Sequence, residues 1–232
     1  KLIDRTFGWE IIPPYQFSDN TEWNGISNAI AKFGTNHMGG SSMGPGRLYQ
    51  KLPFHLVENE FAPRNTDLRT AMIKNSYDIK NKSGIDFGCG TGAFVFSLCK
   101  AGAKCIGMDR DHQAIGVAWA IECYYDTGAR FFVEDIYGFI ERIHWDWLSH
   151  GLWCPQMQND HFGNRSSSFS LDFCLFLAVF QWLIRDIGVD KTGKIIGWLG
   201  ELSSVMFFET SYGDAGDGAG EAIAKVGLTN RL

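Results

Sequence analysis

The residues with the clearest chemical meaning lie between positions 86 and 109. An apolar stretch is followed by the pattern D-x-G-x-G-x-G, formed by Asp86, Gly88, Gly90 and Gly92. Glycines at such a turn let the backbone approach a ligand closely, and the helix expected after them presents free N–H groups. Asp109 ends the next apolar stretch, where a carboxylate can accept hydrogen bonds from both hydroxyls of a ribose. The pattern therefore predicts a site for a nucleoside-containing cofactor.

Two cofactors fit this spacing. Gly88, Gly90 and Ala93 also satisfy the G-x-G-x-x-G/A pattern of dinucleotide-binding proteins, and Asp109 lies at about the 20-residue distance expected there. Asp86 opposes a dinucleotide, because its carboxylate would stand beside the negatively charged pyrophosphate. S-adenosylmethionine has no phosphate and carries an ammonium and a sulfonium, so the same carboxylate favours it. A nicotinamide-dependent oxidoreductase remains the alternative.

The surrounding sequence alternates between short apolar runs and helical patterns. The expected strands cover residues 85–87, 104–108, 130–133, 171–177 and 205–209. The expected helices cover residues 92–101, 113–125, 137–143 and 191–202. Strands that alternate with helices predict an α/β domain with a mostly parallel sheet and right-handed crossovers.

Residues 1–80 are expected to form an N-terminal extension that is rich in loops and helical near residues 66–79. Thr66 is the expected N-cap of that helix, and an apolar stripe is formed by Leu68, Met72 and Ile73. Residues 81–232 form the expected cofactor-binding domain. It is interrupted by an insertion at 144–169, which is rich in Trp and His and is expected to cover the substrate side of the pocket.

The insertion also contains metal-ligand residue types, namely His144, His150, Cys154 and His161. Their spacing matches no zinc signature, so we predict no metal. No catalytic residue is assigned. A general base is needed only if the methyl acceptor arrives protonated, and Glu209 and His161 are the two candidates for that role.

The linked motifs resemble the class I S-adenosylmethionine-dependent methyltransferases, which share D-x-G-x-G-x-G and an acidic residue at the end of the second strand. The resemblance continues at 134–135, at 172–182 and at 207–210, which are similar to the family's third, fourth and fifth strand regions. It implies a Rossmann-like fold and S-adenosyl-L-methionine as cofactor. Members end with a sixth and a seventh strand. Few residues follow position 209, so we expect this chain to lack both strands and to leave its fifth strand at an edge.

The resemblance also implies which residues contact each ligand. The cofactor-binding residues would be Asp86, Gly88, Cys89, Gly90, Gly92, Asp109, Arg110, Asp135, Ile136 and Ala178. The substrate-facing residues would be Phe180, Gln181, Trp182, Arg64 and Arg69. A narrower likeness is to methyltransferases that cap O-antigen polysaccharides or modify the tRNA wobble uridine. Those relatives carry V-F/L-H-H or L-Y-H-R where this chain has V-F-Q-W at 179–182.

The amino-acid composition indicates which classes of binding partner to expect. The net charge is -5, whereas dedicated nucleic-acid binders carry a basic surface. A small-molecule or glycan acceptor is therefore favoured, with a tRNA-modifying enzyme and a non-catalytic binding module as alternatives. None of the 6 cysteines forms a C-x-x-C pair, which is typical of reduced thiols and a cytoplasmic setting. No apolar run reaches the roughly 18 residues of a membrane span. The oligomeric state is not predicted.

Overall fold

The computed structural model describes residues 30, 48–55, 66–140 and 171–210 of the 232-residue chain. Within these residues the centre of the fold is a sheet of five strands in the order β3-β2-β1-β4-β5. The strands are β1 (Ser83–Phe87), β2 (Lys104–Asp109), β3 (Arg130–Val133), β4 (Leu171–Leu177) and β5 (Ser203–Glu209). Every neighbouring pair is parallel. The expected α/β fold with a parallel sheet is confirmed.

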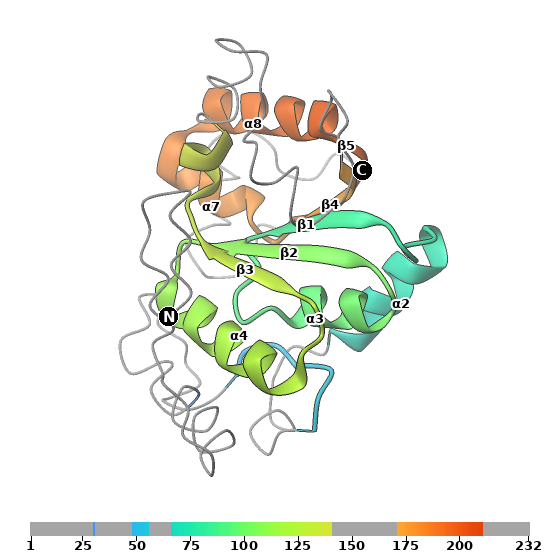
Figure 1. The fold of residues 1–232 in the computed structure, drawn as a ribbon. Coiled ribbons are helices and arrows are strands. Elements are labelled where there is room, and N and C mark those ends of the chain that lie inside the picture. The colour runs from blue at the N-terminus through green and yellow to red at the C-terminus, as the bar shows by residue number, and fades with distance from the viewer. Residues whose placement is uncertain (1–29, 31–47, 56–65, 141–170, 211–232) are drawn as a thin grey trace, which may run out of the picture.

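Helices cover both faces of this sheet (Figure 1). One face carries α2 (Asp67–Ser76), α3 (Ala93–Lys100) and α4 (His112–Tyr125). The other carries α7 (Phe180–Ile187) and α8 (Val189–Leu202), and residues 136–140 are also helical. The sequence did not predict α7, because its first residues were assigned to a turn that faces the substrate. α7 ends at Gly188, whose φ of 83° is unfavourable for other residues, and α8 starts directly after it.

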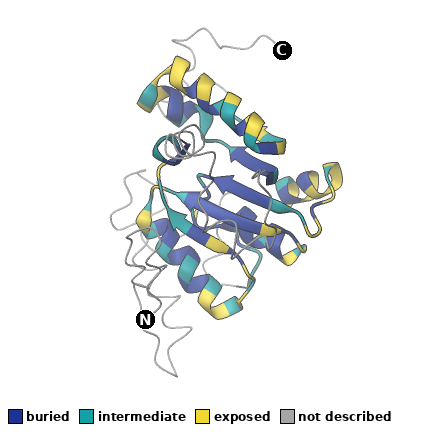
Figure 2. Cartoon of the chain, turned by 45° about the horizontal axis from the view of Figure 1, so that its top comes forward, coloured by how far each residue is buried: buried dark blue, intermediate teal, exposed yellow. Residues whose placement is uncertain are grey.

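Two apolar clusters, one on each face, hold the helices against the sheet. Most residues of β1, β2 and β4, in the middle of the sheet, are buried (Figure 2). Phe96 and Phe173 lie in the first cluster, and Phe87 and Phe176 lie in the second. The first cluster also contains residues from before position 81, namely Leu48, Leu52, Ile73 and Ile79. These residues therefore share one hydrophobic core with the sheet and with helices α3 and α4.

The apolar stripe expected on α2 is wrong in part. Leu68 is 70% exposed and Met72 is 61% exposed, whereas Thr70 and Ile73 are buried. The buried side of α2 is therefore the one that carries Thr70 and Ile73. Thr66 is also buried and lies one helical turn before Thr70 on the same side. Thr66 does occupy the N-cap position, but its hydroxyl donates to the Lys51 carbonyl instead of capping the helix.

Several predictions fall outside the described residues. They concern Arg64, the insertion at 144–169, the metal-ligand types within it, and any strand within 211–232. In the described part of the chain, β5 pairs only with β4. Among the described helices, none has the length and hydrophobicity that a membrane span requires.

Candidate functional site

The glycine-rich loop lies at the carboxyl end of β1, the central strand. Its backbone is held by the protein itself: the Gly88 and Cys89 N–H groups donate to the Met108 carbonyl at 2.8 and 3.0 Å, and Gly92 N–H donates to the Cys89 carbonyl at 3.0 Å. Gly88, Gly90 and Gly92 all have positive φ, at 73°, 56° and 84°. These N–H groups already have acceptors, so the loop offers few donors to a phosphate.

Asp109 fixes the same loop from the end of β2. Its Oδ2 accepts a hydrogen bond from Gly90 N–H at 2.8 Å, and its Oδ1 accepts one from Asp111 N–H at 2.8 Å. Burial raises the pKa of the Asp109 carboxyl, while these two hydrogen bonds act in the opposite direction. A carboxylate has further lone pairs, so Asp109 can still accept from ribose hydroxyls.

Asp86 lies directly beneath the loop and is only 4% exposed. Its Oδ2 has no hydrogen-bond partner among the described residues. Burial, and then the nearby charge of Asp109, raise the pKa of Asp86 well above its ordinary value. The same burial, with the charges of Asp86 and Asp109, raises the pKa of the Cys89 thiol, which is therefore neutral and packs as a small apolar group.

Most of the unpaired buried oxygens in the described residues gather around this edge of the sheet. They belong to Gln50, Asp86, Gln113, Gln181 and Thr210. Gln113 follows β2 in the first turn of α4, Gln181 follows β4, and Thr210 follows β5. Buried polar atoms normally have partners, so a cluster of unpaired acceptors indicates a ligand that brings hydrogen-bond donors or positive charge. The donor set of S-adenosylmethionine, with its ammonium, amino group and ribose hydroxyls, fits this site.

Three other expected cofactor-binding residues, Asp135, Ile136 and Arg110, lie in different surroundings. Asp135 is exposed, and its Oδ2 accepts from Gly138 N–H at 3.3 Å, so it caps the helical residues 136–140. Ile136 is buried in the second apolar cluster. The Arg110 side chain pairs with Asp186 of α7 at 2.9 Å, a partner that the sequence did not reveal.

On the substrate side, β4 ends in a strained residue. Ala178 has a φ of 57°, which is uncommon for a residue with a Cβ and is often found at functional sites. Its carbonyl accepts from Gln181 Nε2 at 2.9 Å, so the Gln181 Oε1 atom is left as an acceptor. Phe180 lies edge-on to Phe208 of β5, with ring centroids 5.3 Å apart. Trp182 is half-buried, and the Arg185 guanidinium lies 4.5 Å from its ring centroid.

Arg69 of α2 reaches the same edge from the other side. Its guanidinium forms an ion pair with Glu209, at the end of β5, at 2.6 Å. Glu209 also accepts the Ala178 N–H at its carbonyl, at 2.8 Å. The structure therefore brings Arg69, one of the two candidate arginines, to the carboxyl ends of β4 and β5. The carboxylate of Glu209, one of the two candidate bases, is already engaged in this ion pair.

A solved structure has the same arrangement of strands and helices. Superposition with a crystal structure of the bifunctional kinase-methyltransferase WbdD gives a TM-score of 0.59 over 76% of this chain and 36% of that chain, at 20% sequence identity. This chain has the class I methyltransferase fold. In open parallel sheets, ligands generally bind at the carboxyl ends of the strands, and the loop after β1 lies at that edge of the sheet here.

Local sequence similarity points in the same direction. A stretch of 47 residues, 20% of this chain, is 47% identical to ribosomal protein L11 methyltransferase of Shewanella baltica strain OS185 and covers 16% of it. A stretch of 39 residues, 16% of this chain, is 54% identical to the enzyme of the same name from Haemophilus influenzae strain PittEE and covers 13% of it. The chain thus matches less than a fifth of the length of these relatives. No family model matches.

Two residues near this edge of the sheet could not be identified from the sequence. Asp186, the partner of Arg110, lies on the unpredicted helix α7. Gln50 lies beside Gly90, where a Cβ on that glycine would be 3.9 Å from Gln50 Oε1. Neither belongs to a local motif, and an unpaired buried amide can be recognised only in three dimensions. The described residues contain no group of three metal-ligand side chains that could hold an ion.

Proposed function

We propose that this chain binds S-adenosylmethionine at the carboxyl edge of its sheet and transfers the methyl group to a small-molecule or glycan acceptor. The observation that supports this most strongly is the pairing of the glycine loop with buried, partly unpaired acceptors, above all Asp86 Oδ2. A positively charged cofactor is stabilised by such acceptors, whereas a pyrophosphate is repelled by them.

The same atoms weigh against a nicotinamide cofactor. Dinucleotide-binding loops hold a pyrophosphate with free N–H groups, but here the Gly88, Cys89, Gly90 and Gly92 N–H groups donate within the protein. Two carboxylates, Asp86 and Asp109, would lie beside the phosphates. The glycine loop therefore offers few donors to a pyrophosphate and places two carboxyl groups beside it, which disfavours the oxidoreductase alternative.

Bound S-adenosylmethionine supplies an electrophilic methyl group on a sulfonium. The role of this chain is to hold the methyl acceptor in line with that group and to exclude water, which is catalysis by proximity and desolvation. Phe180 and Phe208, whose rings pack edge to face shortly after Ala178 and near the end of β5, would provide an apolar wall for the acceptor. Gln181 Oε1 could accept a hydrogen bond from a hydroxyl or amine of the methyl acceptor. No general base is assigned, since Glu209 is held by Arg69.

Calorimetric titration with S-adenosylhomocysteine and, separately, with NADH tests the cofactor assignment. We expect low-micromolar or tighter binding of S-adenosylhomocysteine and none of NADH. Gly90→Arg should abolish binding, because the Cβ side of Gly90 is open for a cofactor and the new side chain would fill it. Gly128→Arg, at a positive-φ glycine with open space at the far end of α4, controls for backbone strain and added charge. Binding of NADH in place of S-adenosylhomocysteine would contradict the proposal.

The acceptor is tested by incubating the protein with methyl-labelled S-adenosylmethionine and size-fractionated cell extract. We expect label in the small-molecule or glycan fraction. Label confined to protein would instead favour a protein acceptor, as the names of the matched ribosomal protein L11 methyltransferases suggest. Label confined to RNA with steep salt dependence would favour the tRNA alternative. Cofactor binding without any labelled product would favour a binding module.

A further inference from the structure

We infer that Gln50 is a cofactor-binding residue that holds the amino-acid end of S-adenosylmethionine. This inference rests on the proposed function. Gln50 lies 40 residues before Gly90 in the chain, yet its Oε1 is 3.9 Å from the position of a Cβ on that glycine. The same Oε1 is buried and has no hydrogen-bond partner in the described part of the chain. Both observations place an unused acceptor at the loop that approaches the cofactor most closely.

The segment that carries Gln50 is anchored along α3. Leu48 and Leu52, on either side of it, are buried at 0% and 1% exposure in the first apolar cluster. Further along, the Phe54 ring lies 5.1 Å from the ring of Phe96, the fourth residue of α3. The segment therefore runs beside α3 from its N-terminal end, at Gly90, toward its C-terminal end.

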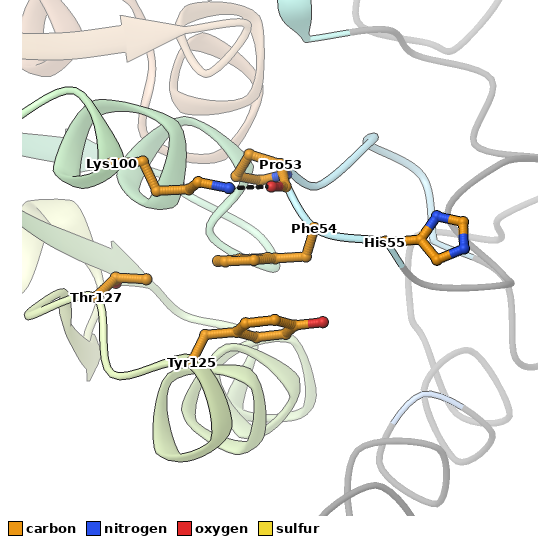
Figure 3. A pocket seen from close by; sticks show the side chains of 6 residues that line it. All are labelled: Pro53, Phe54, His55, Lys100, Tyr125 and Thr127. Atoms are coloured by element: carbon orange, nitrogen blue, oxygen red, sulfur yellow. Dashed lines mark hydrogen bonds between the residues drawn. The ribbon is translucent and has the colours of Figure 1, made fainter.

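Figure 3 shows the anchor at that C-terminal end. The Phe54 ring stacks on Tyr125 with centroids 3.9 Å apart, and Lys100 Nζ donates to the Pro53 carbonyl at 2.6 Å. His55 points away from these side chains. The hollow there, of about 440 Å³, lies where α3 and α4 end, far along α3 from the glycine loop. These contacts fix this end of the segment to α3 and α4. Gln50, at the other end of the segment, lies at the glycine loop.

The chemistry of an amide selects the amino-acid end of the cofactor. Asp109 already supplies an acceptor for the ribose hydroxyls. The ammonium and carboxylate of the methionine part need an acceptor and a donor close together, and a glutamine side chain offers both. Asp86 Oδ2, beneath the same loop, is another buried acceptor without a partner in the described residues.

The test compares two ligands on the full chain. S-adenosylhomocysteine has the amino-acid part, and 5′-methylthioadenosine lacks it. For Gln50→Leu we expect the affinity for S-adenosylhomocysteine to fall about 10- to 100-fold, because a hydrogen bond to a charged group is lost. The affinity for 5′-methylthioadenosine should stay within about twofold of the wild type, because this ligand lacks the group that Gln50 would bind. Gln50→Glu keeps an acceptor oxygen and should retain more affinity for S-adenosylhomocysteine than Gln50→Leu.

Lys51→Ala is the matched control, since Lys51 is the next residue and its ion pair with Asp67 is largely exposed. It should leave both affinities unchanged. Equal losses for the two ligands in Gln50→Leu would mean that the segment has shifted and would overturn the inference. Wild-type affinity for S-adenosylhomocysteine in Gln50→Leu would overturn it as well. Failure of the wild-type protein to bind either ligand would instead refute the proposed function, so the two failures are distinguishable.

Discussion

Replacing Asp109 by alanine is expected to lower both the stability of the fold and the affinity for the cofactor. The substitution leaves two N–H groups, those of Gly90 and Asp111, without the acceptors that now lie at 2.8 Å. A hydrogen bond to a charged group contributes about 1.5–3 kcal/mol. Burial raises the pKa of Asp109, so removing this carboxylate also relieves an unfavourable charge that offsets part of the loss. We therefore expect the free energy of unfolding at pH 7 to fall by about 1–3 kcal/mol.

A loss of that size corresponds to a melting temperature lower by about 3–10 °C for a domain of this length. Differential scanning calorimetry without ligand measures it. Titration with S-adenosylhomocysteine measures the second effect, for which we expect a loss of about 30- to 1000-fold, or roughly 2–4 kcal/mol. Asp190→Ala, an exposed carboxylate in the first turn of α8, is the control. An unchanged melting temperature would show that Asp109 does not fix the loop, and unchanged affinity would remove its role toward the ribose.

Two further substitutions test the loop. Because the pKa of Asp86 is raised in the folded state, the free energy of unfolding should fall as the pH rises from about 4, the ordinary pKa, through the folded pKa. Asp86→Asn should flatten this decline in a pH series of urea melts and raise the free energy of unfolding at pH 8 by roughly 1–2 kcal/mol. It should also weaken binding of S-adenosylhomocysteine. Gly92→Ala should cost roughly 2–4 kcal/mol, because φ is 84° and a Cβ would lie 2.6 Å from Phe131 Cε1. Gly193→Ala, in open space on α8, should instead stabilise by about 0.5–1 kcal/mol; equal effects would contradict this reasoning.

The strands were predicted well because each is a short apolar run between turn residues. The expected range 130–133 and the expected range 171–177 match β3 and β4 residue by residue. Helix α7 was missed because it begins close behind β4, and its first residues were assigned to a turn after that strand. For α2 the helix itself was predicted, but the face expected to be buried, with Leu68 and Met72, is exposed. Apolar spacing identifies a helix, but it does not say which face finds a partner in the fold.

The site was predictable only where it is local. The glycine loop and Asp109 form a motif with fixed spacing, so the sequence placed them together. Gln50, the Arg69–Glu209 pair and the Arg110–Asp186 pair join segments that are distant in the chain. Such contacts depend on how helices pack on the sheet, and a single sequence carries no signal for them.

The central position of β1 has a consequence for how the protein folds. β1 carries Asp86 and leads into the glycine loop, and its neighbour β4 begins far later in the chain; Ser83 and Asp172 are hydrogen-bonded across 89 residues. Closing so long a loop is slow, and pairings of this kind form late. During synthesis β1 can pair with β2 at once, but its other edge stays open until β4 has left the ribosome. We therefore expect the cofactor site to be among the last parts of the fold to form. A cofactor would then bind only after β4 has paired with β1.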